Sequence, residues 1–418
     1  MIIKDVLFCG GQSGFFFDDQ RAIKQGARAD GFAYEGNTVT PGFRVIRQAG
    51  ECVSIMLLLE NGAMAVGDAV AVQYSGAGGR DPLFLAEHYL PFLNEEILPL
   101  LKGLDITGFR EADAMLEDIR KDGRKLHTAL RYGLSQALLD AVAKGAGRLP
   151  VEVICDEYDL PVICEPVPVF GQTGDHRYDG ADRMILKHVD ILPHALINSI
   201  DGKLGRDGGK LVEYVEWLAG RIRKLRLDEN YIPDIHIDVY GNLGTIFNND
   251  IAAMTGFLAG LRDAAGEFSL YIEGPMDMEE KPAQIENLSA LRNSLKRSGA
   301  DVKLVADEWC NTLEDIKDFA DTACCDMIQV KTPDLGSMHN IVEAVLYCRE
   351  KKVGCYQGGT CNETDLSARS CVHAALAARP DRMLAKPGMG FDEGYMIVRN
   401  EMERTLALLK HKRSHERV

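Results

Sequence analysis

The stretch MIQVKTPDLG, residues 327–336, contains a short apolar run that ends in a lysine. Met327 to Val330 has the pattern of a β-strand, and the Thr-Pro-Asp-Leu-Gly that follows has the pattern of a turn. Since side chains alternate faces along a strand, Lys331 would share a face with Gln329. Taken alone, this pattern fits an exposed edge strand as well as an inward-facing functional lysine.

Strand-like segments surround this one and alternate with helical stretches. Eight such units predict a (β/α)8 TIM-like barrel or a close variant of one. A doubly wound sheet is the alternative, but no GxGxxG follows a strand. The eight segments are VPVF (167–170), ILPHALI (191–197), HIDVY (236–240), LYIEG (270–274), KLVADE (303–308), MIQVK (327–331), VGCYQGG (353–359) and MLAKPG (383–388).

The first part of the chain is organised differently. Residues 53–76 form two apolar runs joined by Asn61-Gly62, which predicts a β-hairpin. Helical patterns follow, including residues 126–144, and strands followed by helices indicate an α+β domain. We therefore expect an α+β domain over residues 1–160 and a barrel over residues 161–418.

The chain has 418 residues, a formal net charge of −16 and 11 cysteines without a CxxC pair. The negative charge argues against nucleic acid and anionic membrane surfaces as partners. No signal-peptide pattern opens the chain, and no apolar run approaches the roughly 20 residues of a membrane helix. We expect a cytoplasmic protein with reduced thiols, in which Cys324-Cys325 serve packing. We also expect residues 74–82 to form a loop and residues 411–418 a frayed, solvated tail.

Acidic residues follow three consecutive strands of the predicted barrel, and Lys331 follows the next. They are Asp238 in HIDVYG, Glu273 in YIEGP and Asp307 in VADEW. Each acid alone could cap a helix or face water. Barrel active sites lie at the carboxyl ends of the strands, so the series predicts one site. Three converging carboxylates repel one another unless a cation lies between them, and their oxygens favour Mg²⁺.

Such a site suits the removal of a proton beside a carboxylate. The loss of this proton places negative charge on the carboxylate oxygens, and a bound Mg²⁺ ion stabilises that charge. Lys331 can act as the base if its pKa falls, and both burial and a nearby dication favour a fall.

A second polar series supports a substrate that carries a carboxylate. Amide, imidazole and hydroxyl groups can hold an anion, although each of these residues alone also fits a structural role. Cys361 is a poor candidate for a nucleophile, because no paired histidine is visible. The series comprises Gln172 in FGQTGD, His194 in LPHALIN, Gln329 in MIQVK, and Thr360 and Cys361 in GGTCNET.

Several strings together resemble the methylaspartate ammonia-lyase family of the enolase superfamily. The resemblance implies a capping domain on a modified barrel, and a homodimeric, Mg²⁺-dependent enzyme that K⁺ activates. The implied reaction is elimination of ammonia from (2S,3S)-3-methylaspartate to give mesaconate, as in glutamate fermentation. The strings include FFFDDQRAIKQGARADGFAYEG, LPHALIN, HIDVYG, IEGPMD, VADEWCNT, VKTPDLG, QGGTCNET and KPGMGFDEG.

The resemblance also implies a role for each candidate residue. Lys331 matches the base that removes the proton beside the distal carboxylate. His194 matches a residue on the opposite face, which contacts the metal-bound carboxylate and offers a base for the other stereoisomer. Ser337 departs from the glycine that we expect in this family. The remaining matches are the metal ligands Asp238, Glu273 and Asp307, and the substrate contacts Gln172, Gln329, Thr360 and Cys361.

Other functions remain open at this point. A racemase, cycloisomerase or sugar-acid dehydratase of the same superfamily would use the same metal site. A Schiff-base aldolase would use Lys331 as a nucleophile but would not need three carboxylates. A non-catalytic protein would not need the complete residue set. Phe170, Tyr356 and Leu384 fit a pocket for the substrate methyl group and fit core packing equally.

Overall fold

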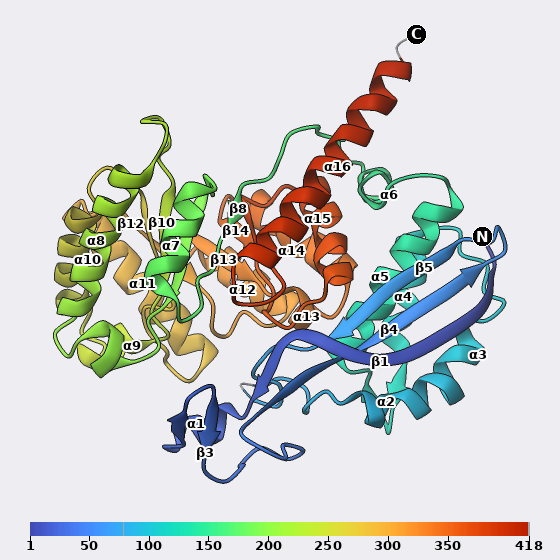
Figure 1. Cartoon of the computed structure of the whole chain (residues 1–418), viewed down its shortest axis with the longest axis horizontal. Helices are drawn as coiled ribbons and strands as arrows, with labels where there is room; N and C mark the ends of the chain where they lie inside the picture. Colours follow the sequence, from blue (N-terminus) through green and yellow to red (C-terminus); the bar gives the residue numbers. More distant parts are fainter. Residues whose placement is uncertain (78, 417–418) are drawn as a thin grey trace.

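The structure is a computed structural model that describes residues 1–77 and 79–416. Figure 1 shows two assemblies side by side. A barrel with its helices occupies the left and centre, and a small sheet with its own helices lies on the right, where the N-terminus is. The C-terminal helix extends beyond the rest of the molecule.

Eight parallel strands close the barrel, which excludes the doubly wound alternative. Each of the eight segments predicted from the sequence contributes one strand, so this prediction is confirmed. In barrel order the strands are β10 (Asp234–Asp238), β11 (Leu270–Glu273), β12 (Val302–Ala306), β13 (Met327–Val330), β14 (Gly354–Gln357), β15 (Arg382–Leu384), β8 (Val169–Phe170) and β9 (Ile191–Leu196).

The two faces of β13 have different surroundings. Ile328 and Val330 belong to the large core between the strands and the helices. Met327 belongs to a separate apolar cluster that takes one residue from each of several strands. Gln329 and Lys331 alternate with Ile328 and Val330, so they lie on the inner face with Met327. The inward-facing interpretation of Lys331 is therefore confirmed.

Helices surround the barrel and begin with side-chain caps in several places. Thr312 and Asp315 form a capping box at the start of α12. Ser337, where we expected a glycine, caps α14 through its hydroxyl. The helices are α7 (Arg177–Leu186), α8 (Gly209–Leu225), α9 (Asn242–Ile246), α10 (Ile251–Ala265), α11 (Lys281–Ser298), α12 (Leu313–Thr322), α13 (Thr332–Leu335), α14 (Met338–Lys351), α15 (Asp365–Ala378), α16 (Asp392–Glu416) and the π-helix η3 (Ile200–Leu204).

The N-terminal sheet contains β1 (Ile3–Asp18), β4 (Arg47–Leu59) and β5 (Met64–Val70) in antiparallel order. The hairpin predicted at Asn61-Gly62 joins β4 to β5 and is confirmed, whereas β1 was not predicted. Helix α5 (Thr128–Gly145) packs on β5. Smaller elements complete this part: α1 (Gln20–Lys24), β2 (Arg28–Asp30), β3 (Ala33–Glu35), α2 (Ala86–Phe92), η1 (Leu93–Ile97), α3 (Leu98–Leu101), α4 (Phe109–Ala114), η2 (Met115–Asp118), β6 (Arg120–Lys121), β7 (Arg124–Lys125) and α6 (Pro150–Glu157).

The predicted frayed tail is wrong for residues 411–416, which continue helix α16. Lys412 forms an ion pair with Glu152 of α6 at 2.6 Å, and Arg413 donates to the backbone of Val162. These contacts extend the helix; residues 417 and 418 lie outside the described part. Residues 74–77 and 79–82 contain no helix or strand, as expected for a loop, and residue 78 is also outside the description.

The cysteines and the hydropathy agree with the expectations. All eleven thiols are free, and Cys324 and Cys325 are fully buried in the large core, which confirms their packing role. None of the described helices is long and apolar enough to cross a bilayer.

Helix α5 and strand β5 approach each other through Gly133, so substitution there should destabilise the fold. A Cβ at Gly133 would lie 2.4 Å from the Ala69 nitrogen. We expect Gly133→Ala to lower the free energy of unfolding by about 1–3 kcal/mol through overpacking. Gly260→Ala in α10 meets open space and should instead gain up to about 1 kcal/mol from helix propensity. Thermal unfolding followed by circular dichroism measures both; equal stabilisation by both variants would contradict the close approach.

Candidate active site

A cavity of about 420 Å³ opens at the carboxyl ends of the barrel strands. Its lining includes both parts of the chain: Gln73, Tyr74 and Arg80 come from the N-terminal part, and the rest comes mainly from the barrel. All but one of the residues predicted for the site line this cavity. They are Gln172, His194, Asp238, Asp307, Gln329, Lys331, Thr360 and Cys361. Glu273 is fully buried and lies 3.5 Å from the His194 ring.

The three predicted metal ligands come from adjacent strands. Asp238 and Glu273 are register partners at the ends of β10 and β11, and Asp307 directly follows β12. Ligand atoms of His194, Asp238 and Glu273 lie within 4.8 Å of one another. Asp307 lies apart from this group, because its Oδ1 is 2.5 Å from the ammonium of Lys331.

Burial and mutual repulsion dominate the electrostatics of these carboxyls. Burial raises the pKa of Asp238 well above its usual range, and the charges of Glu273 and Asp307 raise it further. Burial also raises the pKa of Asp307 to about 6, although the Lys331 ammonium opposes this effect. Carboxylates held in this way gain from a shared cation. A set of buried carboxylate oxygens suits a hard ion, so the residues present fit Mg²⁺.

Lys331 is charged in the metal-free chain. Burial disfavours its ammonium, but the nearby carboxylates of Asp307 and Glu308 outweigh burial and raise the Lys331 pKa. The sequence suggested a lowered pKa for Lys331, and without a metal this is not found. The reason is the direct contact between Asp307 and Lys331, which the sequence did not show.

Glu273 is oriented by two neighbours that the sequence reasoning missed. Burial lowers the pKa of His236 to about 4, so its neutral ring donates from Nε2 to Glu273 at 2.7 Å. Tyr356 donates its hydroxyl to the other carboxylate oxygen at 2.7 Å, and Gln329 contacts the same hydroxyl. His236 could have been found, because it precedes Asp238 by two residues and so shares its face.

Residues of the N-terminal part also reach the site, and no periodic pattern in the sequence predicted them. Arg80 donates to Asp334 at 2.8 Å, and Asp334 lies in the short helix α13, which directly follows Lys331. The amide oxygen of Gln73 accepts a contact from the Cys361 thiol at 3.5 Å. The substrate-contact candidates are therefore held from both parts of the chain.

The remaining candidates differ in their access to the cavity. Gln172 donates to the backbone of Gly388 at 2.9 Å, which directs its amide along the cavity wall. Phe170, Tyr356 and Leu384 all pack in the apolar cluster inside the barrel, and Leu384 alone of these three also lines the cavity. Core packing thus accounts for Phe170 and Tyr356, and Leu384 is left as a contact for a small apolar group.

Comparison with known proteins identifies the family. The profile of the methylaspartate ammonia-lyase N-terminus matches residues 1–159, and that of the C-terminus matches residues 161–411. The chain belongs to the methylaspartate ammonia-lyase family. The methylaspartate ammonia-lyase of Citrobacter amalonaticus is 60% identical over 99% of this chain and 100% of its own. That of Clostridium tetanomorphum is 53% identical over 98% and 99%.

Solved structures of this family have the same architecture. A Citrobacter amalonaticus methylaspartate ammonia-lyase containing (2S,3S)-3-methylaspartic acid aligns with a TM-score of 0.97, covering 98% of this chain and 100% of that one. The Mg complex of Clostridium tetanomorphum β-methylaspartase aligns at 0.95, covering 99% and 100%. A muconate cycloisomerase from Pseudomonas fluorescens aligns at 0.61 with 16% identity, over 91% of this chain and 86% of that one. The capped barrel therefore extends beyond the family.

A site of buried, mutually repelling carboxylates should bind Mg²⁺ and gain stability from it. We expect Mg²⁺ to raise the melting temperature, since a ligand at a hundred times its Kd adds about 2.7 kcal/mol. Asp238→Asn should lose this rise, and its metal-free form should melt no lower than the wild type, because burial and the neighbouring carboxylates already disfavour a charge at this position. Asp277→Asn, on the same cavity wall, should keep the rise. An equal rise in all three proteins would place the ion elsewhere.

Proposed function

We propose that this chain eliminates ammonia from (2S,3S)-3-methylaspartate to give mesaconate, with Mg²⁺ bound at the carboxylate cluster. One observation carries the proposal: a buried lysine, two buried carboxylates and one half-buried carboxylate, from four consecutive strands, lie at one cavity or directly against its lining. Membership of the methylaspartate ammonia-lyase family supports this choice of substrate. So does the relative solved with (2S,3S)-3-methylaspartic acid.

Asp238, Glu273 and Asp307 would hold the Mg²⁺ ion. When bound, the ion would offset the negative charge that develops on the substrate carboxylate as the proton leaves. His194 lies beside Glu273 at the same cluster, and its buried Nδ1 has no hydrogen-bond partner among the residues that the structure describes. We propose that this imidazole contacts the same substrate carboxylate from the face opposite Lys331.

Lys331 would remove the proton from the carbon that bears the methyl group. The electron pair of that C–H bond forms the new double bond, and the amino group leaves the neighbouring carbon as ammonia. Lys331 must first be neutral. The Asp307 charge that keeps its proton in place in the metal-free chain would be shared with a bound cation, which favours the neutral amine.

The other polar residues of the cavity would bind the charged ends of the substrate. Gln172 and Gln329 offer amides, and Thr360 and Cys361 offer a hydroxyl, a thiol and the backbone of their turn. These groups create a local anion site within a chain whose net charge is −16.

Further parts of the proposal rest on the family alone. We infer K⁺ as an activator, a homodimer and a cytoplasmic location on this ground. The division into a capping domain over residues 1–160 and a catalytic barrel over residues 161–418 is likewise proposed; two family profiles that meet near residue 160 support it.

Incubation with 3-methylaspartate tests the activity directly. Mesaconate is a conjugated diacid, so ultraviolet absorbance should rise when substrate, Mg²⁺ and K⁺ are present, and EDTA should abolish the rise because the carboxylate cluster then lacks its cation. No rise with folded, Mg²⁺-loaded protein would contradict the proposal. Inactivation by borohydride in the presence of substrate would point instead to a Schiff base on Lys331.

Replacing the proposed base should stop turnover but leave the metal site intact. We expect Lys331→Ala to reduce kcat at least about a hundredfold, the range for loss of a general base. The Mg²⁺-dependent rise in melting temperature should persist. Lys303→Ala, which changes an exposed lysine of the neighbouring strand β12, serves as the control and should retain kcat. Near-normal turnover by Lys331→Ala would remove this residue from the role of base.

A further inference from the structure

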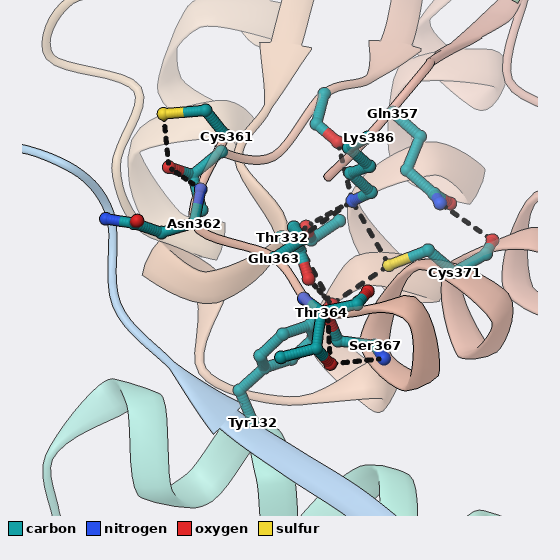
Figure 2. Close-up of polar contacts among 12 residues, drawn as sticks. Tyr132, Thr332, Gln357, Cys361, Asn362, Glu363, Thr364, Ser367, Cys371 and Lys386 are labelled. Atoms are coloured by element: carbon teal, nitrogen blue, oxygen red, sulfur yellow. Dashed lines mark hydrogen bonds and ion pairs between the residues drawn. The ribbon is translucent and has the colours of Figure 1, made fainter. Parts of the chain in front are cut away.

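A fully buried ion pair lies beneath the loops that carry the proposed active-site residues. The ammonium of Lys386 and the carboxylate of Glu363 are 3.0 Å apart, and neither side chain is exposed to solvent. Neither residue lines the cavity. Figure 2 shows this pair with the side chains around it, including Thr332, Cys371 and Tyr132. A buried charge pair destabilises the fold unless hydrogen bonds satisfy both charged groups, so the surrounding residues must supply partners for each group.

Lys386 has all of its donors engaged. Its Nζ contacts the hydroxyl of Thr332 at 2.8 Å, the backbone oxygen of Gly358 at 2.8 Å and the thiol of Cys371 at 3.3 Å, besides Glu363. Thr332 and Gly358 lie in the connections that follow β13 and β14, and Cys371 lies within α15, while Lys386 itself lies in the connection that follows β15. One ammonium therefore ties three neighbouring strand-to-helix connections together.

Glu363 completes the same network from the other side. Its Oε1 accepts from the Thr332 hydroxyl at 2.7 Å, and its Oε2 accepts from the Tyr132 hydroxyl at 3.1 Å. Tyr132 lies on α5, so the network also connects the N-terminal part to the barrel, as Figure 2 shows.

Thr332, Glu363 and Lys386 each lie within two residues of a residue proposed for the reaction or of its hydrogen-bond partner. Thr332 directly follows Lys331 in the chain. Glu363 ends the turn that starts at Thr360-Cys361, and its backbone nitrogen donates to the Thr360 oxygen. Lys386 precedes Gly388, whose carbonyl accepts from the Gln172 amide. A shift of the ion pair would therefore move the base and several substrate contacts together.

The turn at residues 360–364 has further contacts that limit its movement. Asn362 donates to the Phe16 backbone at 3.0 Å, and Thr364 donates to the buried carboxylate of Asp68. The adjacent Gly359 has φ +140°, and a Cβ there would lie 2.5 Å from the Lys386 nitrogen. The ion pair thus leaves no room for a side chain at Gly359.

We propose that Lys386, Glu363 and Thr332 are positioning residues, which hold Lys331 and the Thr360-Cys361 turn in one arrangement across the cavity. The inference rests on the proposed function for the identity of the reaction. An apolar core would accept several arrangements of these connections, because apolar contacts have no preferred direction. Four short polar contacts to one ammonium are directional and so define a single arrangement.

The least disruptive test is Thr332→Val, which keeps the ion pair and the side-chain shape but removes the hydroxyl that bridges Lys386 and Glu363 directly beside Lys331. We expect kcat to fall about tenfold while KM changes less, since small displacements of a reacting group act on the chemical step. The deuterium isotope effect on the abstracted proton should increase. Thr255→Val removes a buried hydroxyl of α10 that donates to Ser294 on α11, away from the cavity lining, and should leave kcat and KM unchanged.

The charge pair itself is tested in the double variant Lys386→Met with Glu363→Gln, which removes both charges at once. Hydrogen–deuterium exchange should accelerate in residues 329–336 and 358–364 but not in β11. This readout does not need activity: if the wild type makes no mesaconate, the proposed function fails, and exchange still tests the positioning. If the double variant does not fold, the kinetics of Thr332→Val test the inference instead. Kinetics of Thr332→Val equal to those of Thr255→Val would overturn the inference, as would unchanged exchange in a folded double variant.

Discussion

The structure depends on three carboxylates that are brought out of water at neighbouring strand ends. Asp238 and Glu273 are held side by side by strand register, and Asp307 follows on the next strand. Burial raises the pKa of Asp238, and its two neighbours raise it further, so a negative charge at this position is disfavoured. Asp307 instead pairs with Lys331. An arrangement that is unfavourable when fully ionised becomes favourable with a dication, and this makes the cluster a site.

The surroundings supply the rigidity that such a cluster needs. His236 and Tyr356 fix the orientation of Glu273 from beneath, inside the barrel. On the side of β13 to β15, the Lys386–Glu363 pair connects the loops that carry the proposed base and the proposed substrate contacts. Both devices are fully buried, so solvent does not weaken them. The cavity thus has charged groups at its centre, and buried hydrogen-bonded residues around them hold these groups in place.

Much of this architecture was readable from the sequence, because it follows from periodicity. Alternation along short apolar runs gave the eight strands and the inner face of Lys331, and strand-end acids gave the cluster. What the sequence did not show depends on contacts between distant segments. The Asp307–Lys331 pair, the reach of Arg80 into the cavity, and the Lys386–Glu363 pair have no local pattern. The helical end of α16 was missed for the same reason, since contacts with α6 stabilise it.

The central claim is that the three carboxylates share one divalent ion, and a crystal structure grown with Mn²⁺ in place of Mg²⁺ tests it most directly. The anomalous difference map should show one strong peak bonded to oxygens of Asp238, Glu273 and Asp307, with the Lys331 nitrogen no longer paired to Asp307. A peak at another place, or an ordered cluster without a peak at saturating Mn²⁺, would contradict the account.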